Sequence, residues 1–181
     1  MESGELYLRR LENTDERPCF DCGDEDLNEF FAKDSKEGTS KLISVTYVFE
    51  TESGEAACYF CLSNDAIRKE DTSRSRFKKL MSPLPREKRY SSMPAVKIGR
   101  LATNKNFQCS GIGTKALDYI KMWFTEGNKT GCRFIIVDAM NNSKTLRFYE
   151  KNGFDFLDSH KGEKNNGHTR LMFFDLLTFR P

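Results

Sequence analysis

The chain has 181 residues, 38% of them hydrophobic, which is enough to bury a substantial core, and we expect a single domain over residues 1–181. Lys plus Arg exceeds Asp plus Glu by only two (29 − 27), so the overall charge implies no obligatory nucleic-acid or membrane partner. No apolar run approaches the length of a membrane span and the acidic start, M-E-S-G-E, is unlike a signal peptide, so we expect a cytoplasmic protein.

The N-terminal part predicts a strand followed by a helix. Residues 5–11, E-L-Y-L-R-R-L, suggest the strand. In the following F-D-C-G-D-E-D-L-N-E-F-F, Gly23 or Asp24 can begin a helix whose acidic first turn suits the helix dipole. The buried stripe of that helix would consist of Leu27, Phe30 and Phe31.

Six cysteines raise the question of a zinc site, because Cys19-x-x-Cys22 and Cys58-x-x-Cys61 have ligand-like spacing. Residues 56–62 read as a strand, however, and residues three apart on a strand point to opposite faces. The second pair could not easily face one metal ion. We therefore expect free thiols and no metal.

Residues 41–50 and 55–63 predict a hairpin with its turn at 51–54. The segment 68–89 that follows holds nine Lys or Arg against three acids. Such a run is typical of a solvated face or a mobile loop, and a patch for an acidic substrate is the alternative. The candidate substrate-binding residues in it are Arg76, Lys78 and Lys79.

The centre of the sequence predicts a strand, a glycine-containing turn and a helix in succession. Val96 to Thr103 is the strand, and a polar turn covers Asn104 to Gln108. Gly111 and Gly113 come next, before apolar residues at helical spacing. Unpaired backbone N–H groups and the positive end of a helix meet here, which favours phosphate. The pattern matches neither the dinucleotide fingerprint nor the nucleotide P-loop.

The C-terminal part predicts a buried parallel strand over 133–139 and a short helix from Asn142 to Lys151. Phe154 to Leu157 and Thr169 to Leu177 would then pair in antiparallel fashion around a polar loop. The two histidines, His160 and His168, are expected to be loop residues.

Three motifs resemble the GCN5-related N-acetyltransferases (GNAT). The acyl-CoA pyrophosphate loop of that family reads Gln/Arg-x-x-Gly-x-Gly/Ala, and Gln108, Gly111 and Gly113 stand at those positions. N-N-S-K-T-L-R-F-Y-E-K-N-G-F is similar to a second family motif, with Asn142 and Tyr149 matching and Thr145 where Ala is usual. F-D-C-G-x-x-x-L-N-x-F-F resembles the first helix of a subgroup that includes bacterial toxins acetylating aminoacyl-tRNA.

The resemblance implies a mixed α+β fold: a mostly antiparallel sheet of six to seven strands, splayed between two parallel central strands and flanked by about four helices. Backbone contacts to pantetheine would come from Leu101, Ala102 and Thr103. The pyrophosphate would be held by Gln108, Cys109, Ser110, Gly111, Ile112, Gly113 and Thr114. Asn142 would bond the pantetheine arm, and Tyr149 would protonate the departing CoA thiolate, since an ordinary tyrosine pKa of about 10 keeps it a donor.

These expectations lead to an acetyl-CoA-dependent N-acetyltransferase that moves an acetyl group to a primary amine by direct attack on the thioester. The amine could belong to a small molecule, a peptide or, in a toxin-like enzyme, an aminoacyl-tRNA; an antitoxin would then be a partner, and a homodimer is left open. A CoA-binding protein without turnover is the alternative, in which Tyr149 is a core residue behind Phe148. The general base stays unassigned between Asp138, Glu150, water and an already neutral amine.

Overall fold

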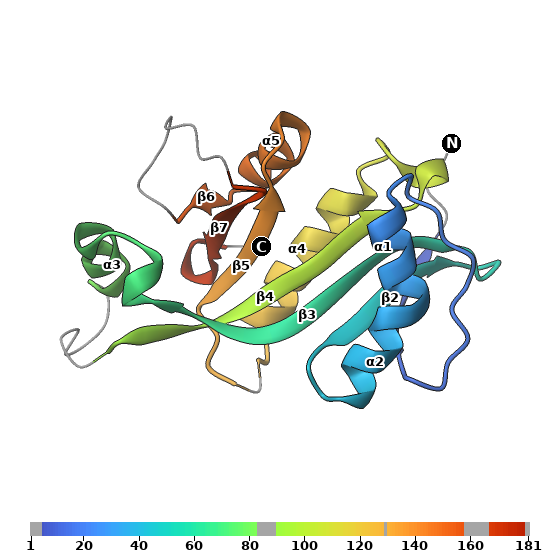
Figure 1. The fold of residues 1–181 in the computed structure, drawn as a ribbon, viewed down its shortest axis with the longest axis horizontal. Helices are drawn as coiled ribbons and strands as arrows, with labels where there is room; N and C mark the ends of the chain where they lie inside the picture. Colours follow the sequence, from blue (N-terminus) through green and yellow to red (C-terminus); the bar gives the residue numbers. More distant parts are fainter. Residues whose placement is uncertain (1–4, 83–89, 129, 158–166, 180–181) are drawn as a thin grey trace. The chain divides into compact units, whose positions relative to one another are not determined.

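The computed structural model describes residues 5–82, 90–128, 130–157 and 167–179. In this part of the chain seven strands form one sheet in the order β1-β2-β3-β4-β5-β7-β6 (Figure 1). The strands are β1 (Leu6–Leu11), β2 (Val45–Thr51), β3 (Ala56–Arg68), β4 (Ser92–Thr103), β5 (Phe134–Met140), β6 (Asp155–Phe156) and β7 (Thr169–Asp175). The α-helices are α1 (Glu25–Glu29), α2 (Ser35–Ser40), α3 (Arg74–Met81), α4 (Ile112–Thr125) and α5 (Ser143–Lys151).

The chain divides into two compact units. Unit 1 combines Met1–Ser63 with Ile98–Ile120, and unit 2 combines Asn64–Lys97 with Lys121–Pro181. Units of this kind occur within a single domain as well as between domains, so the single domain predicted from the sequence stays a prediction.

In unit 1, β1 and β2 pair antiparallel, and β2 and β3 pair antiparallel in the predicted hairpin. A π-helical segment, Phe30–Asp34, joins α1 to α2, so that residues 25–40 form one interrupted helix. This helix lies across β2 and β3 (Figure 1). Phe31 packs there with Val48 and Tyr59, all fully or almost fully buried, and this burial holds the helix to the sheet.

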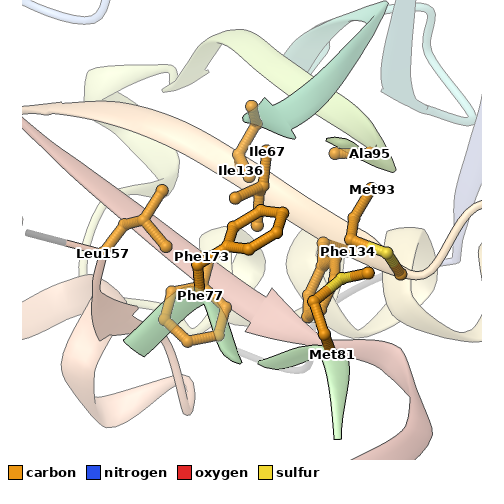
Figure 2. Packing of buried hydrophobic residues seen from close by; sticks show 9 residues of the cluster. All are labelled: Ile67, Phe77, Met81, Met93, Ala95, Phe134, Ile136, Leu157 and Phe173. Atoms are coloured by element: carbon orange, nitrogen blue, oxygen red, sulfur yellow. The ribbon is translucent and has the colours of Figure 1, made fainter. Parts of the chain in front are cut away.

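Unit 2 has its own core on one face of β5 and β7. These strands pair antiparallel, and β7 pairs with β6 in the same sense. Because side chains alternate along a strand, Phe134 and Ile136 share one face of β5. Figure 2 shows Phe77 and Met81 of α3 packed in the same cluster with Phe173 of β7. The fold class predicted from the sequence is confirmed: it is a mixed α+β protein with one seven-stranded sheet and, counting residues 25–40 as one, four α-helices among the described residues.

Two expectations are revised in detail. The hairpin strand β3 continues to Arg68, five residues past the predicted end at Ser63. Part of the basic segment is the helix α3, whose N-cap Ser73 accepts a hydrogen bond from the Arg76 N–H. Residues 83–89 of that segment, and His160, lie outside the described residues. Within the described residues, no helix combines the length and the apolar character needed to cross a membrane.

Candidate functional site

The turn after β4 is built by one buried asparagine. Asn104, 5% exposed, accepts a hydrogen bond at its Oδ1 from the N–H of Asn106 (3.1 Å) and donates from Nδ2 to the carbonyl of Ala56 (3.1 Å). Its own N–H donates to the carbonyl of Ala57 at 2.9 Å. Asn104 thereby attaches the end of β4 to β3 and begins a short 3₁₀ turn, Lys105–Phe107.

The residues between this turn and α4 include two with a left-handed backbone. Cys109 and Gly111 both have positive φ, 61° and 86°. The first helical bond of α4 runs from the Lys115 N–H to the Gly111 carbonyl (3.0 Å). The first N–H groups of a helix have no acceptor within it, so those near Ile112 to Thr114 suit an anion.

Gly111 is required by its backbone angle. A Cβ built there would meet no heavy atom within 4 Å, so the space beside it is open, while its φ of 86° strains any L side chain. Open space beside the first N–H groups of α4 suits a bound anion such as pyrophosphate. The assignment of residues 108–114 to pyrophosphate therefore agrees with the local geometry and stays a prediction.

Gln108 uses its side-chain amide for internal contacts. Its Nε2 donates to the carbonyls of Cys22 (2.8 Å) and Thr103 (3.1 Å). The sequence had placed Gln108 among the pyrophosphate contacts; in the structure its side chain connects the loop to the end of β4 and to the segment before α1. The same segment contacts Lys105, whose N–H donates to the Asp21 carbonyl at 2.8 Å and whose Nζ lies 2.6 Å from Asp21 Oδ2.

Asp21 and Asn28 are residues that the sequence reading did not connect with the site. The available signal was the F-D-C-G-x-x-x-L-N-x-F-F motif, which the sequence analysis interprets as a helix start and as a resemblance to a toxin subgroup, without a role at the loop. Asp24 is indeed the N-cap of α1, accepting from the Leu27 N–H at 3.1 Å. The motif's aromatic residues pack on Tyr59: Phe20, Phe30 and Phe31 lie with ring centroids 5.0, 6.2 and 4.7 Å from it.

At the end of β4, Leu101 and Thr103 are half-buried, whereas Ala102 packs in the unit 1 core. The hydroxyl of Thr103 donates to Cys58 Sγ at 3.7 Å. Burial raises the pKa of Cys58 to about 12, so it is a thiol at neutral pH, and burial also raises the pKa of Cys22. No group of three His, Cys, Asp or Glu among the described residues could hold a metal ion.

Unit 2 contains the two residues of the second motif, both on α5. Asn142 is the N-cap: its Oδ1 accepts from the Thr145 N–H at 2.9 Å. Tyr149 is 6% exposed, and its ring makes edge contacts with Phe148 (5.1 Å) and Phe154 (5.2 Å). After the helix, Gly153 has φ 81° and passes so close to Phe174 that a Cβ would lie 3.0 Å from its ring.

The two carboxylates considered as general bases differ in their surroundings. Asp138 on β5 is ion-paired with Lys97 on β4, Nζ to Oδ2 2.5 Å. Glu150 is exposed on α5. Asp138 shares its strand face with Ile136 of the unit 2 core by alternation. Neither the ion pair of Asp138 nor the exposure of Glu150 identifies the general base.

The three basic candidates on α3 are not equivalent. Arg76 pairs with Asp155 (2.9 Å) and lies over the Phe173 ring, 5.6 Å from its centroid. Lys78 and Lys79 are exposed, as is Arg74 at the start of the helix. Arg76 thus attaches α3 to β6 and β7, whereas its neighbours present charge to solvent.

Comparison with known proteins identifies the architecture. Residues 79–155 match the family model of the acetyltransferase (GNAT) domain. A tyrosine-to-phenylalanine mutant of KacT matches 95% of this chain and 95% of its own, with TM-score 0.74 and 23% identity. AtaT complexed with acetyl-methionyl-tRNAfMet matches 94% and 95%, with TM-score 0.70 and 22% identity. AtaTR bound with AcCoA matches 95% and 94%, with TM-score 0.71 and 22% identity.

The fold is the GNAT fold. The resemblance stated from the sequence is therefore confirmed. A further match is to a structure described as a bacterial toxin, with TM-score 0.71 and 15% identity. The match to an acetyltransferase domain indicates an acyltransferase, and the matching segment contains Gln108, Gly111, Asn142 and Tyr149. Comparison with curated protein sequences gives no match.

Proposed function

We propose that this protein is an acetyl-CoA-dependent N-acetyltransferase acting on a primary amine. The observation that carries the proposal is the loop Gln108–Thr114, whose two left-handed residues and following helix N-terminus suit a pyrophosphate within a GNAT fold. The solved neighbour AtaTR, bound with AcCoA, supports the choice of acyl donor.

Acetyl-CoA, when bound, supplies an activated acetyl group. The N–H groups of Gly111 to Thr114 would hold its pyrophosphate, the backbone of Leu101 to Thr103 would pair with its pantetheine amides, and Nδ2 of Asn142 would donate to the same arm. A backbone N–H near Leu101 would stabilise the oxyanion, and the hydroxyl of Tyr149 would give its proton to the departing sulfur. The solved neighbours include mutants of KacT and AtaT in which a tyrosine is replaced by phenylalanine. These mutants support the choice of a tyrosine as the residue to test.

We take the amino group of an aminoacyl-tRNA as the favoured acceptor. The neighbour AtaT is complexed with acetyl-methionyl-tRNAfMet, and the exposed basic residues of α3 offer charge for an RNA backbone. A neighbouring toxin is bound to the C-terminus of its antitoxin, so an antitoxin is the corresponding partner to seek. A homodimer and a cytoplasmic location remain predictions.

The first test is Gly111→Glu, measured by calorimetry with acetyl-CoA. A carboxylate at this position would repel the pyrophosphate, so binding should be lost while the circular dichroism spectrum is kept. Gly127→Glu is the matched control, because Gly127 also has positive φ (67°) and no heavy atom within 4 Å, but follows the C-terminal end of α4. Unchanged acetyl-CoA affinity in folded Gly111→Glu would reject the loop assignment.

The acceptor is tested by release of free CoA thiol with a panel of aminoacyl-tRNAs, polyamines, aminoglycosides and peptides. We expect turnover with aminoacyl-tRNA. Turnover with a small amine alone would keep the acetyltransferase and reject the RNA acceptor. Binding of acetyl-CoA without turnover on any acceptor would favour the non-catalytic alternative.

A further inference from the structure

A polar network in unit 1 joins the start of α1 to the proposed pyrophosphate loop. Lys105 contacts Asp21 twice, through its backbone N–H (2.8 Å) and through Nζ (2.6 Å). Gln108 contacts the carbonyl of Cys22 (2.8 Å). Three bonds therefore connect residues 21 and 22 with the segment immediately before Cys109, across more than eighty positions of sequence.

Asn28 on α1 holds the other side of this network. Its Oδ1 accepts from the backbone N–H of Cys22 (2.9 Å), and its Nδ2 donates to Asp21 Oδ1 (3.1 Å). The Gly23 N–H also donates to Asp21 Oδ1 at 2.9 Å. Asn28 thus fixes the Asp21 carboxylate that Lys105 contacts and the N–H of Cys22, the residue whose carbonyl accepts from Gln108.

The loop needs such support because its conformation is unfavourable for the isolated chain. Cys109 is one of two non-glycine residues with positive φ in the described part of the chain, and it directly follows Gln108. The left-handed region is costly for most residues other than glycine and persists only where neighbouring contacts enforce it. The two bonds from Gln108 Nε2, to Cys22 and to Thr103, supply those contacts.

We propose that Asp21, Asn28 and Gln108 are positioning residues that hold residues 108–111 in the anion-binding conformation and so raise the affinity for acetyl-CoA. The proposal rests on the proposed function for the identity of the ligand. It gives the F-D-C-G-x-x-x-L-N motif a role beyond starting a helix. Preorganisation raises affinity because the ordering of the loop is completed before the ligand arrives.

The test compares Gln108→Ala and Asn28→Ala with the wild type, by calorimetry with acetyl-CoA and by amide hydrogen exchange of residues 105–112. Each variant removes at least two hydrogen bonds, so we expect the Kd for acetyl-CoA to rise about tenfold. In the enzyme assay the KM for acetyl-CoA should rise more than kcat falls. Gln108→Arg, which can donate to both carbonyls, should recover most of the affinity.

Two controls separate positioning from general destabilisation. Asp24→Ala removes the N-cap of α1, which weakens the helix by a comparable amount but removes no bond to residues 103–108. Asn106→Ala removes a side-chain amide of the same turn whose Nδ2 donates to Glu55 Oε1 at 3.3 Å. Both controls should leave the Kd and the exchange of the loop close to wild type.

The outcomes distinguish the positioning role of Asp21, Asn28 and Gln108 from the proposed binding of acetyl-CoA. Faster exchange in residues 105–112 and weaker binding in Gln108→Ala and Asn28→Ala, but not in the controls, would support the proposal. Wild-type affinity and wild-type exchange in both variants would overturn it. Wild-type protein that binds no acetyl-CoA would overturn the proposed function, and the exchange measurements would still decide whether these residues order the loop.

Discussion

At the scale of single residues, Tyr149 shows how one side chain can fit two roles. Its ring is packed between Phe148 and Phe154, as expected of a core tyrosine, yet it stands at the position of the catalytic tyrosine in the GNAT motif. Packing depends on the ring, whereas proton donation depends only on the hydroxyl. Removing the hydroxyl therefore separates the two roles.

Tyr149→Phe should lower kcat by about 10²-fold or more, with little change in acetyl-CoA affinity, because only protonation of the leaving thiolate is lost. The measurement is steady-state kinetics with calorimetric Kd and a melting curve. An unchanged Tm would show that the ring packing is kept. Near wild-type kcat would return Tyr149 to a purely structural role.

Asp21 provides a prediction on pH. The hydrogen bond from Lys105 is the main cause that lowers the pKa of Asp21 to about 2, and the pKa of Lys105 is raised by the same partner. A lowered carboxyl pKa means that the pair contributes stability above the ordinary value of 3.8 and loses it as pH falls through about 2. On the alkaline side the contribution is present below 10.5 and lost as pH rises through the raised pKa of Lys105.

An NMR titration of the Asp21 carboxyl carbon should therefore have its midpoint at about 2, and acetyl-CoA affinity should show no change from this pair between pH 6 and 9. Lys105→Ala should move the midpoint up toward 3.8, the ordinary value, because it removes the largest cause of the shift. A wild-type midpoint near 3.8 would contradict the contact.

At the scale of elements, α3 changes how the basic segment should be tested. Phe77 and Met81 bury one side of this helix, and Arg76 bonds it to Asp155, so reversing Arg76 would disturb packing as well as charge. The exposed residues Arg74, Lys78 and Lys79 are better suited to a test of RNA binding. Three phosphate contacts would contribute strongly to salt dependence, since each releases counterions.

The triple change Arg74→Glu, Lys78→Glu and Lys79→Glu should raise the KM for aminoacyl-tRNA about tenfold or more and flatten its dependence on salt, while sparing acetyl-CoA binding. Acetyl transfer is measured across a salt titration. Lys33→Glu, Lys36→Glu and Lys41→Glu, in the helical residues 30–40 and at the C-cap that follows them, form the charge-matched control. An equal salt response in wild type and α3 variant would reject this helix as an RNA contact.

At the scale of the whole molecule, the open matter is whether the two units fold together. The sequence predicts one domain, and one domain should unfold in a single cooperative transition. Each unit contains a natural probe. Trp123, the only tryptophan, belongs to unit 2, and Cys58, with no exposed surface, belongs to unit 1.

Urea unfolding followed by Trp123 fluorescence and by alkylation of Cys58 should give the same midpoint, and acetyl-CoA should shift both upward together. Cys58→Ser serves as the control for labelling of the other five thiols. Two separate midpoints would show that units 1 and 2 unfold independently and would contradict the single domain.

Local patterns in the sequence predict most of the helices and strands, and the class of fold was predicted from the resemblance of three motifs to the GNAT family. The alternation in residues 41–50, the acidic helix start at Asp24 and the glycine at the beginning of α4 each act over a few residues. Motif spacing likewise located the loop at 108–114 and the Asn142–Tyr149 pair.

Only the tertiary structure decided how side chains far apart in sequence combine. No local pattern shows that Gln108 donates to the Cys22 carbonyl or that Asn28 donates to the Asp21 carboxylate. The ion pair between Arg76 and Asp155 is equally hidden from the sequence. Cys109 in the left-handed region was also beyond a sequence pattern, because cysteine has no general preference for it. Such contacts depend on which surfaces the chain brings together, and a polar side chain bonds the partner that folding places within reach.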